Sequence, residues 1–120
     1  MQYTLLIYGD EAGWPKLTAE QQDAAMAAFG AYRSALQDAG VFVATNRLEP
    51  TDAATTLRAP GGKIEVIDGP FAETKEQLGG YYLIEAPDGE AALRWASRCP
   101  GVMFGASIEV RPVMPVPVTT

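Results

Sequence analysis

The most chemically suggestive stretch of the chain begins at Asp68, a carboxylate that follows an expected strand and precedes Gly69-Pro70. A carboxyl group at a strand end beside a pocket can act as a general acid or base, with a pKa that burial raises and neighbouring cations lower. The same side chain can instead accept hydrogen bonds from its own downstream amides, because Asp-Gly is a frequent turn pair. Asp68 is therefore the candidate catalytic residue, with a turn-forming role as the alternative.

Charged residues near that position provide candidate contacts for an anionic ligand. Lys75 can bind a negatively charged group and Glu73 can position Asp68 or a water molecule, although such charge clusters are commonly solvated loops. Arg47 follows a predicted strand, at a point where its planar guanidinium can clamp a carboxylate. The sequence thus predicts Arg47, Lys75 and Glu73 as substrate-binding residues.

Two adjacent tyrosines, Tyr81 and Tyr82, complete the set of candidate substrate-binding residues. Successive residues of a strand point to opposite faces of the sheet, so we expect one tyrosine in the core and the other at a pocket or subunit interface. Aromatic packing and a catalytic hydroxyl both remain open as roles. The preceding Gly79-Gly80 indicates a bulge or a close backbone approach.

The composition removes several common chemistries. The chain has no histidine, so it lacks the commonest general base and any Ser-His or Cys-His pair. Its single cysteine, Cys99, forms no intramolecular disulfide and favours a reducing, cytoplasmic compartment. We expect no metal and no other cofactor, because few metal ligands besides carboxylates remain and the spacing of a phosphate-binding Walker loop is missing.

Charge and hydropathy also limit the partners. The 120 residues include 9 basic and 15 acidic side chains, a net charge of −6, without the basic stripe of a nucleic-acid binder. No apolar run approaches the roughly 18 residues of a membrane span, and the first residues do not resemble a signal peptide. With 48% hydrophobic residues, we expect one globular domain over residues 1–114 and a tail over residues 115–120.

Short apolar runs and turn signals predict the elements that position these residues. Thr18 and Gln21 form a capping box at a helix start, and Gly40 is typical of a left-handed helix end. The expected strands cover residues 2–8, 41–45, 81–85 and 107–113, the helices run over 18–40 and 88–99, and a hairpin joins 55–59 to 63–67. Without the inserted hairpin this order is βαββαβ, the ferredoxin-like arrangement of the α+β class.

The predicted sheet has one face that the helices leave uncovered. Side chains of the first strand, Tyr3, Leu5 and Ile7 or their alternates, make that face partly apolar, together with Tyr81 or Tyr82. A partly apolar sheet face needs a cover, and a second copy of the chain is the simplest one. We therefore expect a homodimer.

One long motif resembles a known family. Asp68-Gly69-Pro70-Phe71, followed by Glu73, Lys75-Glu76 and Gly79-Gly80-Tyr81-Tyr82, is similar to the DGPF branch of the YCII-related family. Cys99-Pro100-Gly101, Ile108-Glu109-Val110-Arg111-Pro112 and the opening Met1-Gln2-Tyr3-Thr4-Leu5-Leu6-Ile7-Tyr8 add to the match. The resemblance extends over about residues 1–114, nearly the whole chain.

The resemblance implies a ferredoxin-like domain that pairs sheet to sheet as a dimeric α/β barrel, with a pocket between sheet, helix and loop. Some members of the branch are encoded beside extracytoplasmic-function sigma factors, which implies a regulatory or stress context. Other YCII relatives look like enzymes with a His–Asp pair, including a dehydrochlorinase of hydroxylated aromatic rings. In this chain Asp68 has no histidine to complete such a pair.

Three functions are consistent with these observations, so the sequence leaves open whether the chain is an enzyme. The first is a regulatory protein that binds a small molecule at the sheet and dimer interface. The second is a lyase- or isomerase-like enzyme for a small anionic, aromatic compound: Asp68 moves the proton, Arg47 and Lys75 hold negative charge, and Tyr81 or Tyr82 polarises an oxygen. The third is an accessory protein of a sigma factor.

Overall fold

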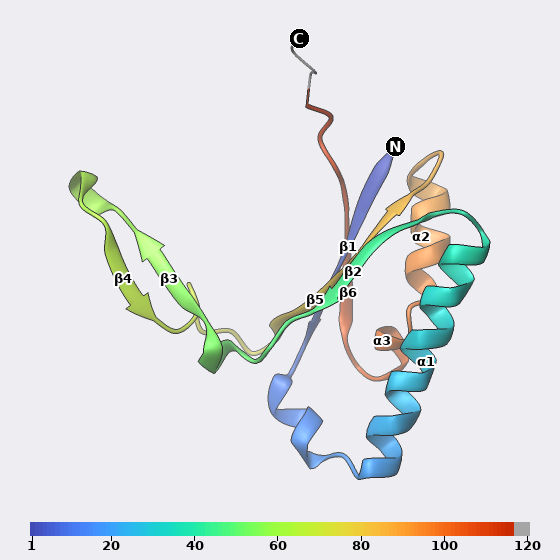
Figure 1. Cartoon of the computed structure of the whole chain (residues 1–120), viewed down its shortest axis with the longest axis horizontal. Coiled ribbons are helices and arrows are strands. Elements are labelled where there is room, and N and C mark those ends of the chain that lie inside the picture. Colours follow the sequence, from blue (N-terminus) through green and yellow to red (C-terminus); the bar gives the residue numbers. More distant parts are fainter. Residues whose placement is uncertain (117–120) are drawn as a thin grey trace.

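A four-stranded antiparallel sheet lies at the centre of the computed structural model, which describes residues 1–116, and helices cover one face of it (Figure 1). The strands are β1 (Gln2–Gly9), β2 (Phe42–Arg47), β5 (Gln77–Glu85) and β6 (Ser107–Pro112). Their order β2-β5-β1-β6 is compatible with the ferredoxin-like arrangement. The predicted α+β class, with an antiparallel sheet and helices, is confirmed.

The long helix α1 (Ala19–Asp38) has the ends that the sequence predicts. The Thr18 hydroxyl accepts a hydrogen bond from the Gln21 amide at 3.1 Å, and the Gln21 side chain accepts one from the Thr18 amide at 2.9 Å. Gly40, just after the helix, has φ +72°, a left-handed conformation that glycine adopts without strain. The capping box and the glycine end are both confirmed.

A second helix and a short third one complete the layer on the covered face. In α2 (Gly89–Ser97), Asp88 caps the first turn by accepting a hydrogen bond from the Ala91 amide at 2.9 Å. The sequence predicts no element between the helix that ends at residue 99 and the strand that begins at residue 107, but residues Pro100–Met103 form a short helix, α3. Proline at the first turn starts a helix because its ring presets φ and its missing N–H has no helical partner to lose.

The core lies between the sheet and these helices. Leu5, Leu36 and Ile84 are fully buried there. The rings of Tyr32 and Tyr82 pack edge to face with centroids 5.1 Å apart, and the Tyr32 hydroxyl donates to a backbone carbonyl of α2 at 2.7 Å. Of the two adjacent tyrosines, Tyr82 is therefore the core residue.

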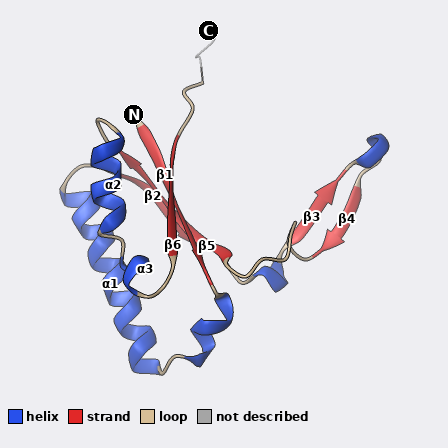
Figure 2. Cartoon of the chain, turned by 180° about the vertical axis from the view of Figure 1, so that it is seen from behind, coloured by secondary structure: helices blue, strands red, loops and turns tan. Residues whose placement is uncertain are grey.

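The hairpin inserted between β2 and β5 forms a separate sheet, here called the arm (residues 54–71). Its strands β3 (Thr55–Arg58) and β4 (Glu65–Asp68) pair antiparallel, as the sequence predicts, around a turn at Pro60–Gly62. Figures 1 and 2 show that the arm projects from the side of the main sheet opposite the helices. The radius of gyration is 16.7 Å, against about 14 Å for a compact chain of this length.

The strand β5 starts at Gln77, earlier than the predicted start at Tyr81. The pairing with β1 shifts by one residue between Ile7 and Tyr8, opposite Gly79, so the predicted bulge is confirmed. The C-terminal tail was expected over residues 115–120; residues 115–116 carry no regular structure and 117–120 lie outside the described residues. None of the helices within residues 1–116 is long and apolar enough to cross a membrane.

Candidate functional site

A cavity of about 570 Å³, here called the α1 cavity, lies between α1, the 3₁₀ helix η1 (Glu11–Lys16) and the β2–β5 edge of the sheet. Its walls include Trp14 of η1, Met26, Phe29 and Arg33 of α1, Arg47 of β2 and Tyr82 of β5. Aromatic and aliphatic walls with a few polar groups are typical of small-molecule sites.

Helical spacing brings the α1 residues to the same wall. Met26, Phe29 and Arg33 stand at positions i, i+3 and i+7, which share one face of a helix. Phe29 is half-buried at the cavity edge, where it packs against the core. Arg33 is a cavity residue that sequence reasoning missed, although this spacing is the signal that could have found it.

Both arginines of the cavity stack on aromatic rings. The Arg47 guanidinium carbon lies 4.2 Å from the ring centre of Trp14, and that of Arg33 lies 4.9 Å from the ring centre of Phe42. Arg47 also approaches the Met26 sulfur at 3.5 Å. Within residues 1–116 neither guanidinium forms an ion pair. Stacking leaves the N–H donors at the guanidinium edge available to an anion.

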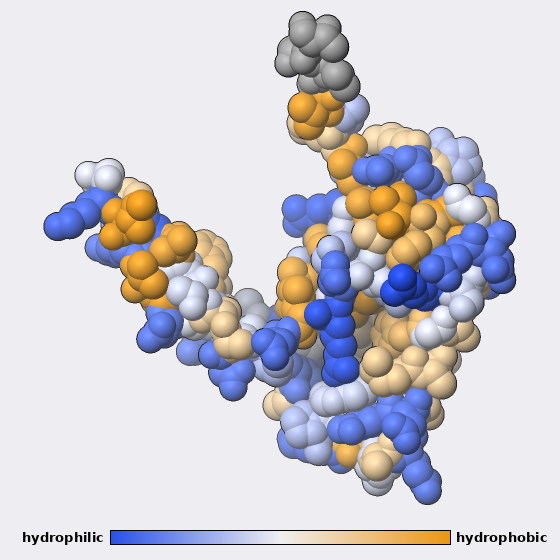
Figure 3. Space-filling model, in the orientation of Figure 1, coloured by the Kyte–Doolittle hydropathy of each residue, from blue (hydrophilic) through white to orange (hydrophobic). Residues whose placement is uncertain are grey.

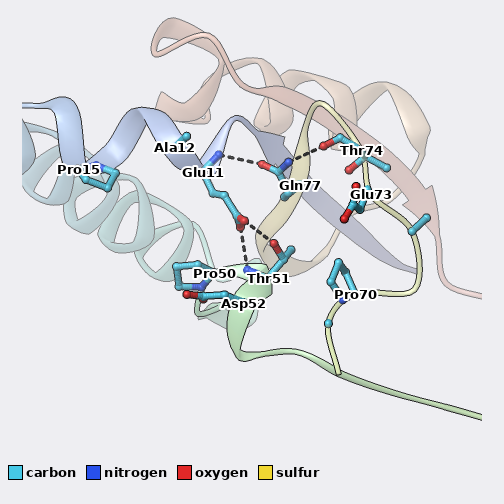
Figure 4. Close-up of a pocket in the computed structure, with 12 residues that line it drawn as sticks. Glu11, Ala12, Pro15, Pro50, Thr51, Asp52, Pro70, Glu73, Thr74 and Gln77 are labelled. Carbon is cyan, nitrogen blue, oxygen red and sulfur yellow. Dashed lines mark hydrogen bonds between the residues drawn. The ribbon is translucent and has the colours of Figure 1, made fainter. Parts of the chain in front are cut away.

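Three acidic residues also line the α1 cavity, and two of them already have partners. The Asp10 carboxylate accepts a hydrogen bond from the Ala12 amide at 3.0 Å, which caps η1. The Glu11 carboxylate accepts one from the Thr51 amide at 2.9 Å and another from the Thr51 hydroxyl (Figure 4). Only Glu49, an exposed residue, lacks such a partner within residues 1–116. The Asp10 and Glu11 carboxylates therefore accept hydrogen bonds from Ala12 and Thr51 and form no ion pair with the two arginines.

The two tyrosines face opposite sides of the sheet, as predicted. Burial raises the pKa of Tyr82, while a hydrogen bond with the Thr45 side chain opposes that shift. Tyr82 is therefore a neutral phenol at physiological pH, able to donate a hydrogen bond but not to act as a base. The Tyr81 hydroxyl accepts a hydrogen bond from the Asn46 side-chain amide at 2.8 Å on the other face.

Gly80 fixes how closely β2 approaches β5 at the cavity. A Cβ atom at this position would lie 2.9 Å from the Asn46 carbonyl oxygen and 3.4 Å from the Arg47 Cα. At the neighbouring Gly79 the nearest such atom is 3.9 Å away, which is ordinary contact. The predicted close backbone approach is confirmed for Gly80, and this approach places Arg47 beside the cavity.

A second cavity of about 600 Å³, here called the arm-base cavity, lies next to the first, between η1 and the two ends of the arm. Figure 4 shows Gln77 linking its walls: the Gln77 side chain accepts a hydrogen bond from the Glu11 amide at 2.9 Å and donates one to the Thr74 carbonyl at 2.6 Å. Together with the Glu11–Thr51 contacts, these bonds tie η1 to the base of the arm. Glu73 lines this cavity.

The structure separates the other predicted site residues from the α1 cavity. Asp68 is exposed on β4, opposite Thr55, and lines neither cavity. Within residues 1–116 its carboxylate has no ion pair and no hydrogen bond with the amides that follow it. Lys75 is exposed and likewise lines neither cavity. Arg47 and Tyr82 thus lie together at the α1 cavity, the Tyr81 hydroxyl lies on the opposite face of the sheet, and Asp68, Glu73 and Lys75 lie elsewhere.

Cys99 and the acidic residues provide no second reactive centre. The Cys99 side chain is buried, and this burial raises the pKa of its thiol, which disfavours the nucleophilic thiolate. Among the described residues, no group of three or more histidine, cysteine, aspartate or glutamate side chains is arranged to hold a metal ion. The chemical groups that the α1 cavity offers are guanidinium, phenol and aromatic groups.

These features define a small α+β domain that has a cavity between its sheet and its long helix. The model of the YCII-related domain matches residues 1–117, and the chain belongs to that family. An uncharacterised protein of Rhizobium meliloti (strain 1021) is 40% identical over 114 residues, which cover 94% of this chain and 92% of the relative. The family predicted from the motifs is thereby confirmed.

Proposed function

We propose that this YCII-family protein binds a small aromatic anion in the α1 cavity and works as a homodimer in a regulatory context. The observation that carries the ligand class is the pair of guanidinium groups, Arg33 and Arg47, without ion-pair partners beside mostly aromatic and aliphatic walls. An uncompensated cation beside aromatic surface favours a ligand that has both an acidic group and a ring.

The two parts of such a ligand gain free energy in different ways. Burial against Trp14, Phe29 and Met26 contributes about 25 cal/mol for each Å² of apolar surface removed from water. A carboxylate on the guanidinium of Arg47 makes charge-assisted hydrogen bonds of roughly 1.5–3 kcal/mol each, at the lower end here because the side chain is exposed. The ring supplies most of the affinity and the arginines select for the acid.

The acid–base alternative has less support from this geometry. It requires Asp68 near the bound ligand, but Asp68 lies on the arm, outside the α1 cavity. The raised pKa of Tyr82 also makes this phenol a hydrogen-bond donor rather than a base. The proposal therefore assigns binding, and no reaction, to the cavity.

Trp14 provides a direct probe of occupancy because it lines the cavity. In a Trp95→Phe background Trp14 is the only indole, since the chain has two tryptophans. We expect saturable quenching of its fluorescence by benzoate and 2-naphthoate and much weaker quenching by the neutral benzyl alcohol. Equal responses to the acid and to the alcohol would contradict the proposed ligand class.

Arginine variants test the proposed contacts separately. Arg47→Ala should weaken 2-naphthoate binding about tenfold or more, the equivalent of one charge-assisted hydrogen bond. Arg47→Lys should weaken it less, because the charge stays and the planar fork is lost. Arg94→Ala, on the exposed surface of α2 and outside both cavities, is the matched control and should bind like the parent protein. Unchanged affinity of Arg47→Ala would rule out this site.

The uncovered face of the sheet supports the homodimer. Because strand residues alternate, Leu6 and its cross-strand neighbour Tyr81 lie on the face opposite the core, and Leu83 lies on the same face. Here this surface, Leu6, Tyr81 and Leu83, is called the open face. Sedimentation velocity at micromolar concentration should give a dimer, and Leu6→Glu should give a folded monomer. A monomeric parent protein under these conditions would refute the homodimer without affecting the ligand test.

A further inference from the structure

The arm presents apolar side chains that nothing within the described chain covers. Leu57 is 65% exposed, Ile64 72%, Val66 66% and Phe71 74%. Such residues are normally buried, and a contiguous exposed apolar patch typically marks an interaction surface. A two-stranded hairpin is also marginally stable at best in water unless it packs against something. The arm therefore needs a partner surface.

The register of the hairpin gathers part of this apolar surface on one face. Leu57 pairs directly with Val66, so their side chains share a face, and alternation adds the nearby Ile64. Arg58 and Glu65, the next pair along, lie on the opposite face. The end of this face nearest the turn is thus apolar, with Thr55 and Asp68 at its base, whereas the opposite face carries the charged pair beside Thr56 and Ile67.

The direction of the arm indicates where the missing partner lies. The arm leaves the body on the side opposite the helices, which is also the side of the open face (Figures 1 and 2). In Figure 3 the arm and the body stand apart around a wide hollow, with hydrophobic residues visible on the arm. One chain therefore presents the apolar face of the arm and the mixed open face, where Glu109 and Arg111 lie beside the apolar residues, around a common space that it does not fill.

We propose that the apolar face of each arm, formed by Leu57, Ile64 and Val66, packs against a second copy of the chain whose sheet occupies this hollow. The inference rests on the homodimer proposed above. It adds to the contact between the open faces a second contact, here called the clasp, in which the arm of each copy packs against the other copy. Two-fold pairing fits because the same chain carries both surfaces, so one symmetric contact covers two arms and two open faces together. The second copy can cover both the apolar face of the arm and the open face, so the proposal requires no protein of another kind.

The exposed area is large enough to matter for a dimer. At roughly 100 Å² for a fully exposed aliphatic side chain, Leu57, Ile64 and Val66 contribute about 200 Å² of apolar surface on this face. A standard interface buries about 800 Å² on each partner. The apolar face of the arm would thus supply about a quarter of it, and the open face and the rest of the arm the remainder.

Photo-crosslinking tests the clasp directly. With p-benzoylphenylalanine at position 66, irradiation of the purified protein should give a covalent dimer, whereas the same probe at position 65, on the charged face, should give much less. The purified chain is the only protein present, so any product of twice the mass joins two copies. Equal yields from the two positions, or no covalent dimer from a protein that sediments as a dimer, would overturn the clasp.

Serine substitutions measure its contribution to affinity. Leu57→Ser combined with Val66→Ser should raise the dimer dissociation constant at least tenfold, while Glu65→Ser should leave it within twofold. Circular dichroism of each variant checks that the body remains folded. A dimer of unchanged affinity in the double variant would overturn the clasp and leave the open-face dimer standing. A parent protein that is monomeric at every concentration would overturn both, and the naphthoate titration would still test the cavity on its own.

Discussion

The body and the arm use the same kinds of residue in opposite ways. In the body, Leu5, Leu36 and Ile84 are fully buried between the sheet and the helices, whereas in the arm Leu57 and Val66 are about two-thirds exposed. Helices cover the body sheet on one face, but nothing within residues 1–116 covers the two strands of the arm (Figure 1). The difference indicates that one chain encodes a self-sufficient fold and an appendage that depends on another surface.

The largest expected difference between the two regions is in the cost of removing an apolar side chain. Ile84→Ala should lower the free energy of unfolding by about 2–5 kcal/mol, because it leaves a cavity in a packed core. Leu57→Ala should change it by less than about 0.5 kcal/mol in dilute protein, where the arm has no partner. Urea unfolding at low concentration measures both. A comparable loss from the two variants would show that the arm is part of the cooperative core.

The junction where β2 leaves the body provides a sharper contrast between two adjacent glycines. Gly80→Ala should cost about 1–3 kcal/mol and disturb Arg47, because its Cβ would lie 2.9 Å from the Asn46 carbonyl oxygen. Gly79→Ala has room and serves as the matched control. Thermal unfolding of both variants measures the difference. A tolerated alanine at position 80 would mean that the spacing between β2 and β5 is adaptable.

A smaller effect is expected at Tyr32, where the body holds a buried hydroxyl. Tyr32→Phe should cost about 1 kcal/mol at neutral pH, because it removes the hydrogen bond to the Trp95 carbonyl at 2.7 Å. Denaturant unfolding near pH 7 measures this cost. A phenylalanine variant as stable as the parent would show that the Trp95 carbonyl finds another donor.

Alkaline pH should destabilise the body through the same residue. Burial, with smaller contributions from Cys99 and Tyr82, raises the pKa of Tyr32 well above its ordinary value, so the folded state holds a proton that the unfolded state releases above about pH 10. The stability from this group is complete below that pH and is lost as the pH rises through the folded pKa. The slope is up to about 1.4 kcal/mol per pH unit for each such group.

Tyr82 and Cys99 also have raised pKa values through burial, and they add to the alkaline loss. The Tyr32→Phe variant should therefore lose less stability than the parent between about pH 9 and about pH 11. The arm contains no tyrosine or cysteine, so no such loss originates there. An identical pH dependence in parent and variant would show that Tyr32 does not titrate in this range.

Local signals in the sequence predicted most of the body. The capping box at Thr18, the left-handed Gly40 and the bulge at Gly79 depend on neighbouring residues alone, and the structure bears out each of them. Alternation in β5 predicted that one of two adjacent tyrosines is buried. The hairpin around Pro60 could also be predicted, because a Pro-Gly-Gly turn between two short apolar runs is a local pattern.

The site was less accessible to sequence reasoning because its residues meet only in the folded chain. Arg33 and Arg47 come from a helix and a strand, and the contact of Glu11 with Thr51 joins residues 40 positions apart. The motif around Asp68 made it the candidate catalytic residue. Its exposure depends on the direction of the arm, which no local pattern encodes. Secondary structure followed from the sequence, whereas the placement of the arm required the fold.

Hydrogen exchange at two protein concentrations tests the contrast between body and arm most directly. Amides of β1 and β5 should be strongly protected in both samples, because they belong to the body. Amides of β3 and β4 should exchange rapidly in dilute monomer and become protected at concentrations where the dimer forms. Arm amides that exchange equally fast at both concentrations, in a protein that has dimerised, would contradict the account.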